Sequence, residues 1–117
     1  MKENILLEKS KEFAVEIVNL CSKLKHTREY QIRDQILRSG TSISANISEA
    51  NYPQSRLDMI SKFEIALKEA SETENWLEIL HGSNLILDEE YKKLKSDVVR
   101  IKILLIKSIK TLKNKIS

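Results

Sequence analysis

The stretch YKKLKSDVVRIKILLIKSIKTL, residues 91–112, decides the fold of this chain. One set of positions recurs in it at spacings that alternate between three and four residues: Tyr91, Leu94, Val98, Ile101, Leu105, Ser108 and Leu112. Side chains at these spacings share one side of an α-helix, so the pattern predicts a helix that packs against other helices. We expect this helix to begin near Asp88, because Asp88, Glu89 and Glu90 suit the positive end of a helix dipole.

A second apolar stripe runs along the same segment, beside the first. It consists of Val99, Ile103 and Ile106. A helix in an isolated bundle needs only one apolar face, so the second stripe indicates either unusually deep burial or a subunit interface. We favour the interface.

Two helical segments are expected in the first half of the chain. The first runs from about Asn4, as N-cap, to Lys25, and its stripe is Phe13, Ile17, Leu20 and Leu24. The second begins after a cap at Thr27 and ends near Asn51, before Tyr52-Pro53. Its stripe is Ile32, Ile36, Ile43, Ile47 and Ala50.

The run Ser39-Gly40-Thr41-Ser42 lies inside the second segment and is poor helix material. We interpret these small residues as the place where a neighbouring helix backbone comes close, with an irregular turn near Gly40 as a further expectation.

The remaining segment lies between residues 55 and 84. Ser55, followed three residues later by Asp58, resembles a capping box with Asp in the place of the usual Glu. The stripe that follows is Ile60, Phe63, Leu67, Ala70, Leu77 and Leu80, and Gly82-Ser83-Asn84 is a good helix end. Four long helices with short connections predict an all-α fold, an antiparallel up-down-up-down four-helix bundle that forms a single domain over residues 1–117.

Composition agrees with this fold and excludes several classes of protein. The 117 residues include only two Gly and one Pro, and 32% of them are charged. The single cysteine, Cys21, rules out an internal disulfide and is expected in the core. The N-terminus does not resemble a signal peptide, and no apolar run is long enough to span a membrane, so we expect a cytoplasmic protein.

A search for catalytic and metal-binding patterns gives little. Glu78 and His81 have the spacing of half a di-iron motif, but the second Glu-x-x-His pair is missing. There is no His-Glu-x-x-His, phosphate loop or nucleophile elbow. We therefore predict that the protein is not an enzyme and needs no metal or cofactor.

The charges are unevenly distributed along the chain. Residues 98–117 contain no acidic residue, whereas their basic residues are Arg100, Lys102, Lys107, Lys110, Lys113 and Lys115. Such a one-signed helix surface can contact phosphates, but composition alone favours a solvated face whose cations suit a helix C-terminus. Few aromatic residues are available for base stacking, so any binding should be mainly electrostatic.

Two segments resemble a bacterial family, the four-helix-bundle proteins encoded by intervening sequences in large-subunit ribosomal RNA genes. These segments are LRSGTSISANISEA, residues 37–50, and FEIALKEASETENWL, residues 63–77. The most specific part is Ser42 to Glu49, and the chain has Ala50 where the family usually has Gly. The resemblance implies the same bundle and a homo-oligomer, typically a barrel-like pentamer. The family includes the accessory variability determinant of diversity-generating retroelements, which works with a reverse transcriptase and binds nucleic acid through a basic surface.

Two hypotheses follow for the function. In the first, a non-enzymatic, oligomeric accessory protein binds nucleic acid, RNA or DNA, and acts on RNA or a ribonucleoprotein. Its candidate protein partners are a reverse transcriptase and a ribosomal component. Its phosphate contacts would be Lys102, Lys107, Lys110, Lys113 and Lys115, with Arg28, Arg33 and Arg38 as additions. In the second, the protein is a scaffold whose working surface is the stripe Val99, Ile103 and Ile106.

The polar residues of the resembling segments allow two interpretations. Hydrogen bonds between helices could join them into a structural network that fixes register or subunit arrangement. Alternatively, they could form a ligand site. We favour the network, whose members would be Ser42, Asn46, Glu49, Glu69 and Glu72.

Overall fold

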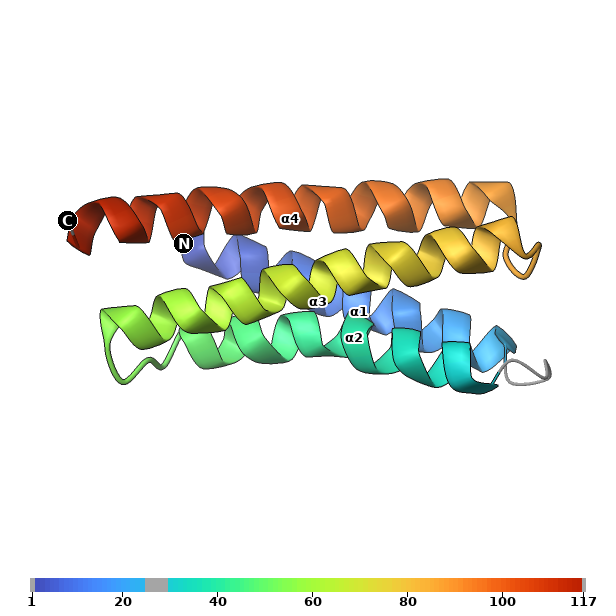
Figure 1. Ribbon diagram of the computed structural model, residues 1–117, viewed down its shortest axis with the longest axis horizontal. Coiled ribbons are helices and arrows are strands. Elements are labelled where there is room, and N and C mark those ends of the chain that lie inside the picture. Colours follow the sequence, from blue (N-terminus) through green and yellow to red (C-terminus); the bar gives the residue numbers. More distant parts are fainter. Residues whose placement is uncertain (1, 25–29, 117) are drawn as a thin grey trace.

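The computed structural model describes the backbone of residues 2–24 and 30–116. Over these residues the chain forms four helices: α1 (Lys2–Leu24), α2 (Tyr30–Ala50), α3 (Arg56–Gly82) and α4 (Asp88–Ile116). No strand occurs in the described ranges, and Figure 1 shows the four helices lying side by side along one axis. The all-α fold predicted from the apolar stripes is confirmed.

The helices alternate in direction and each packs on its neighbours in the sequence. α2 packs on α1 and α3, while α4 packs on α3 and closes the bundle against α1. The α1–α4 seam is the least extensive of the four, and over the described residues no Cα atoms of the diagonal pairs α1–α3 and α2–α4 lie within 8 Å of each other. Up-down-up-down order places both chain termini at one end of a molecule that measures 48 × 22 × 22 Å (Figure 1).

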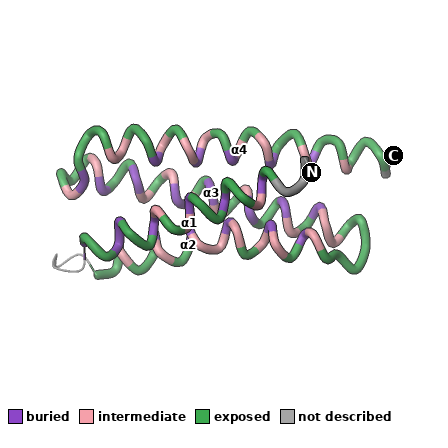
Figure 2. The backbone as a smooth tube through the Cα atoms, turned by 180° about the vertical axis from the view of Figure 1, so that it is seen from behind, coloured by how far each residue is buried: buried purple, intermediate pink, exposed green. Residues whose placement is uncertain are grey.

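The core follows the predicted stripes. In Figure 2 the buried positions of each helix face inward along its length. Phe13, Ile17, Ile43, Leu77 and Leu105 are each no more than 1% exposed. Two expectations are refined: in α3 the small residues Ala66 and Thr73 are fully buried, whereas Leu67 is only half-buried. Small side chains at these positions let α3 approach its neighbours closely.

Gly40 lies where α1 and α2 come close together. A Cβ atom at this position would stand 2.9 Å from Cγ2 and 3.0 Å from Cγ1 of Ile17, which is itself fully buried. A close approach is therefore present at Gly40, but the group that comes close is the side chain of Ile17 and not the helix backbone that was predicted. The irregular turn is not present, because α2 runs as one α-helix through residue 40.

Helix ends were predicted with mixed success. α1 begins at Lys2, and residues 2–4 already have helical backbone. Asn4 therefore lies inside the helix and is not its N-cap. α2 ends at Ala50, one residue before the predicted Asn51, and the predicted ends at Lys25 and Thr27 fall outside the described residues.

The cap of α3 forms at Ser55, whose Oγ accepts a hydrogen bond from the Asp58 backbone N–H at 3.0 Å. The reciprocal bond differs from a standard capping box, because Asp58 accepts from the backbone N–H of Gln54 and not from that of Ser55.

The end of α3 depends on Asn84. This residue has a φ of 60°, in the left-handed region, and Gly82 has no positive φ. The backbone N–H of Leu85 donates to the Leu80 carbonyl at 2.9 Å and that of Asn84 donates to the His81 carbonyl at 3.0 Å. These two bonds form a Schellman motif, in which Asn takes the position more often held by Gly.

Candidate nucleic-acid interface

The basic residues of α4 divide into two groups according to their neighbours on α3. Lys102 donates to Glu74 at 2.8 Å, and Lys113 pairs with Glu64 at 3.0 Å. Further along the same seam, Lys95 lies 3.0 Å from Glu78. The acidic side chains of α3 therefore neutralise part of the positive charge of α4.

The Lys102–Glu74 pair is partly shielded from solvent. The two side chains are 28% and 18% exposed. The hydrogen bond from Lys102, together with the charges of Lys102 and Lys95, holds the pKa of the Glu74 carboxyl below its usual value. Lys102 is thus engaged in holding α3 to α4, and a phosphate would have to compete with Glu74 for it.

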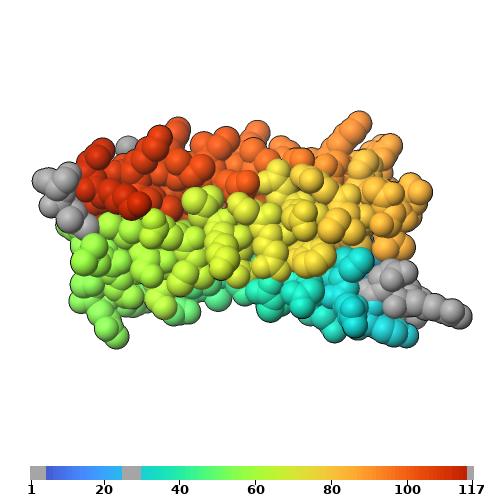
Figure 3. Space-filling model, viewed as in Figure 1, coloured from blue at the N-terminus to red at the C-terminus, as the bar shows by residue number. Residues whose placement is uncertain are grey.

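Three predicted phosphate contacts remain open to solvent. Lys107, Lys110 and Lys115 are exposed and form no ion pair within the described part of the chain. Figure 3 shows the C-terminal half of α4, in orange to red, on the surface beside the green start of α3. These three lysines add positive charge to the exposed surface of the C-terminal half of α4.

The arginines predicted as additional contacts have different positions. Arg33 lies on α2, where its guanidinium pairs with Asp34 at 3.4 Å and stacks over the Tyr30 ring at 5.5 Å. Arg38 also lies on α2 and faces α3. Arg28 lies outside the described residues. The structure therefore does not bring Arg33 or Arg38 together with the lysines of the C-terminal half of α4.

Arg38 joins α2 to α3 through two carboxylates. Its Nη1 donates to Glu69 at 2.9 Å and its Nη2 donates to Glu72. Glu72 also accepts from the indole Nε1 of Trp76 at 2.9 Å. The bonds from Trp76 and Arg38 hold the pKa of Glu72 below its usual value.

Of the five polar residues of the predicted network, two have partners within α2 and three pair between α2 and α3. Ser42 donates to the Arg38 carbonyl at 2.6 Å, and Asn46 donates to the Ser42 carbonyl at 2.9 Å, both within α2. Glu49 pairs with Lys62 of α3 at 3.1 Å. Of the five, Glu69 and Glu72 are brought together, by Arg38, while Ser42 and Asn46 are not bonded to either of them.

A buried polar contact between α2 and α3 escaped the sequence analysis. Ser39 and Thr73 are both fully buried, their hydroxyl oxygens lie 2.8 Å apart, and Thr73 also lies within hydrogen-bond distance of the Glu69 carbonyl oxygen. The sequence feature that could have indicated this contact is a Thr inside the apolar stripe of α3.

The ion pairs between α3 and α4 could also have been predicted. α3 has an excess of acidic residues and α4 an excess of basic residues, so their side chains are candidate partners.

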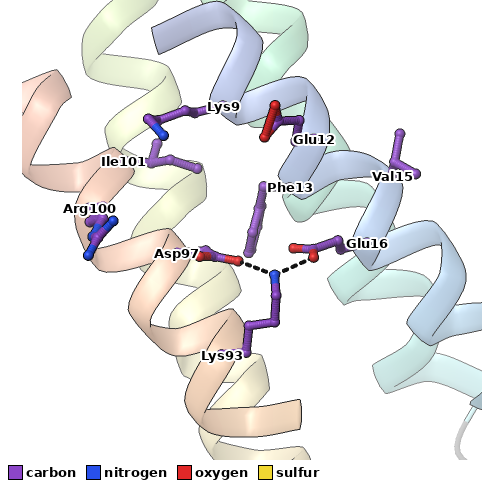
Figure 4. Close-up of a pocket in the computed structure, with 9 residues that line it drawn as sticks. All are labelled: Lys9, Glu12, Phe13, Val15, Glu16, Lys93, Asp97, Arg100 and Ile101. Carbon is purple, nitrogen blue, oxygen red and sulfur yellow. Dashed lines mark hydrogen bonds and ion pairs between the residues drawn. The ribbon is translucent and has the colours of Figure 1, made fainter. Parts of the chain in front are cut away.

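The stripe Val99, Ile103 and Ile106 lies on the outer side of α4. Ile103 is 48% exposed and Ile106 is 39% exposed, whereas Val99 is half-buried. The neighbouring groove between α1 and α4 contains a hollow of about 460 Å³ (Figure 4). Inside it Lys93 pairs with Asp97 of its own helix at 2.9 Å and with Glu16 of α1.

The other groups considered for chemistry are also paired. Glu78 bonds to Lys95, and His81 Nε2 lies 2.5 Å from Asp88 while its ring stacks on Tyr91. Cys21 is buried, which raises the pKa of its thiol to about 11.

Among the described residues, no group of three or more His, Cys, Asp or Glu side chains is placed to hold a metal ion. No helix in the described ranges has the length and apolarity to cross a membrane.

Comparison with known proteins identifies the family. The model of the 23S rRNA-intervening sequence protein family matches residues 2–107. The chain belongs to this family. A similar solved structure is a protein of unknown function from the S23 ribosomal protein family of Bacteroides thetaiotaomicron, which is 52% identical, with a TM-score of 0.90. The match covers 94% of this chain and 99% of that one, and the search among proteins of curated function found no match.

Proposed function

We propose that this 23S rRNA-intervening sequence protein is a non-enzymatic, oligomeric accessory protein that binds RNA or a ribonucleoprotein through the C-terminal half of α4. The observation that carries the proposal is the set of three exposed lysines that have no acidic partner among the described residues, Lys107, Lys110 and Lys115. Ammonium groups on one helix surface attract phosphates and release counterions when they bind them. The name of the family, which refers to ribosomal RNA genes, supports RNA as the nucleic acid.

The paired lysines and the arginines of α2 have lesser parts in this proposal. Lys102 and Lys113 already have carboxylate partners on α3, so we expect weaker contributions from them. Contacts to phosphates position a protein without specifying a base, so little sequence preference is expected. A ribosomal component or a reverse transcriptase remains a candidate protein partner.

Binding of a fluorescent structured RNA, followed by anisotropy, tests the proposal. We expect the triple variant Lys107→Glu, Lys110→Glu, Lys115→Glu to lose binding. The matched control changes Lys11, Lys68 and Lys92, which are exposed elsewhere on the bundle, to Glu and alters the net charge equally. If both triple variants lose affinity to the same extent, the effect is one of net charge and the proposed surface is wrong.

We also propose that the stripe Val99, Ile103 and Ile106 is a contact between subunits, in an assembly for which the family suggests a pentamer. The exposure of Ile103 and Ile106 supports this, because burying the exposed half of an isoleucine side chain contributes roughly 1 kcal/mol. If RNA binding fails, this surface favours the alternative function, a protein-interaction scaffold.

Light scattering coupled to gel filtration tests the subunit contact. Ile106→Glu should reduce the mass of the assembly. Ile65→Glu is the control, because Ile65 on α3 is also 39% exposed but lies outside the stripe. A monomeric wild-type protein, or equal effects of the two substitutions, would contradict the proposed contact.

A further inference from the structure

An apolar hollow opens at the end of the bundle where both termini lie. Its volume is about 700 Å³, and α1, α3 and α4 all contribute to it. Its apolar lining consists of Ile5, Leu6, Met59, Phe63, Leu104 and Leu112. Sites for small molecules have volumes of roughly 300–1,000 Å³ and are lined mainly by such side chains, with a few polar groups that fix orientation.

The charged side chains that line the hollow, among the residues whose side chains are described, are all basic. Lys107 and Lys115 line it together with the hydroxyl-bearing Ser108 and Thr111, and no described acidic side chain does. A smaller hollow of about 230 Å³ adjoins it at Leu104 and adds Lys9 and Arg100, again with no acidic side chain among the described residues. The groove between α1 and α4 is different, because there Lys93 is neutralised by Glu16 and Asp97.

We propose that this hollow binds a free single-chain anionic amphiphile of the fatty-acid class. The acyl chain would lie against the apolar lining, and the carboxylate would lie beside Lys107 and Lys115. Charge complementarity selects this ligand class: the lysines require an anion, and the lining requires a hydrocarbon. A phosphate backbone would satisfy the lysines but would leave the apolar surface exposed to water.

The proposal does not depend on RNA binding. Lys110, a member of the proposed RNA surface, does not line the hollow, and the apolar lining is not used by phosphate contacts. Binding of an amphiphile in the absence of RNA therefore tests the hollow alone. If one of the two proposals fails, the other is still tested by its own experiment.

Titration of the full chain with decanoate, below its micelle concentration, tests the hollow. The readouts are calorimetry and the ¹³C-methyl resonance of Met59, which should shift on binding because Met59 lines the site. In a series of chain lengths, affinity should rise about fourfold for each added methylene until the hollow is full. Decyltrimethylammonium, which has the opposite charge, should bind more weakly than decanoate.

Variants distinguish binding in the hollow from nonspecific binding to the protein surface. Thr111→Trp, at an exposed lining position, should fill the space and remove the Met59 shift, with the fold checked by circular dichroism. Lys107→Gln and Lys115→Gln should each weaken decanoate binding by roughly fivefold, whereas Lys110→Gln should not. Equal binding of the two amphiphiles, insensitivity to Thr111→Trp, or binding only to anionic lipid vesicles and not to free decanoate would overturn the proposal.

Discussion

The two glycines of this chain should respond in opposite ways to the same substitution. Gly40→Ala adds a methyl group 2.9 Å from Cγ2 of Ile17, and Ile17 is fully buried, so its branched side chain cannot move aside. Gly82→Ala adds a methyl group with nothing within 4 Å, at the last residue of α3. The helix propensity gained by replacing Gly with Ala is up to about 1 kcal/mol in each case.

The clash decides the sign at residue 40. Forcing an extra carbon into a packed core costs about 1–3 kcal/mol, which equals or exceeds the gain in propensity. We therefore expect Gly40→Ala to lower the free energy of unfolding by up to about 2 kcal/mol. Gly82→Ala should raise it by about 0.5–1 kcal/mol. Both changes can be measured by urea denaturation monitored by circular dichroism.

A double-mutant cycle identifies the cause. Ile17→Ala alone should cost about 2–5 kcal/mol, because it leaves a cavity in the core. In that background the added methyl group of Gly40→Ala enters vacated space and should become stabilising, with a coupling energy of about 1–3 kcal/mol. The reasoning would be refuted if Gly40→Ala stabilised the wild-type protein as much as Gly82→Ala does, or if the cycle showed no coupling.

Two further predictions concern polar contacts. Since the pKa of Glu74 is lowered in the folded state, its carboxylate contributes stability above its unfolded pKa and loses that contribution as pH falls through the folded value. Glu74→Gln should therefore lower the free energy of unfolding by about 0.5–1 kcal/mol at pH 7 and make no difference in strong acid, and a pH-independent loss would contradict the ion pair. Ser39→Ala removes the hydroxyl that bonds Thr73 in the core, and denaturant titration should show a loss of about 1 kcal/mol, whereas an unchanged midpoint would show that the bond contributes nothing.

The fold could be predicted because every helix repeats its apolar residues at spacings of three and four. The periodicity of Leu94, Val98, Ile101 and Leu105 reports burial directly, and all four side chains are buried. Helix ends depended on weaker local signals. Ser55 was found because its side chain caps α3, whereas Asn4 was mistaken for a cap because residue type alone does not show where a helix begins.

The candidate site was harder to predict, because charge along a sequence does not show which helices face one another. In the sequence, Lys102 and Lys107 are both basic residues of the same helix with no acidic neighbour nearby, yet of the two only Lys102 pairs with an acidic side chain of α3 in the structure. Arg38 appeared to be a free cation and instead bridges Glu69 and Glu72. Pairing between helices depends on relative rotation and axial shift, which spacing within one helix does not determine.

The salt dependence of RNA binding tests the central claim most directly. Each phosphate neutralised by a lysine makes the slope of log affinity against log salt concentration more negative by roughly 0.7–0.9. Contacts by Lys107, Lys110 and Lys115 therefore predict a slope of about −2 to −3, a loss of roughly 20- to 40-fold in affinity between 50 and 200 mM salt. Each single Lys→Gln substitution among the three should make the slope shallower by roughly 0.7–0.9. A flat salt profile, or a slope that these substitutions leave unchanged, would contradict the proposal that this end of α4 binds nucleic acid.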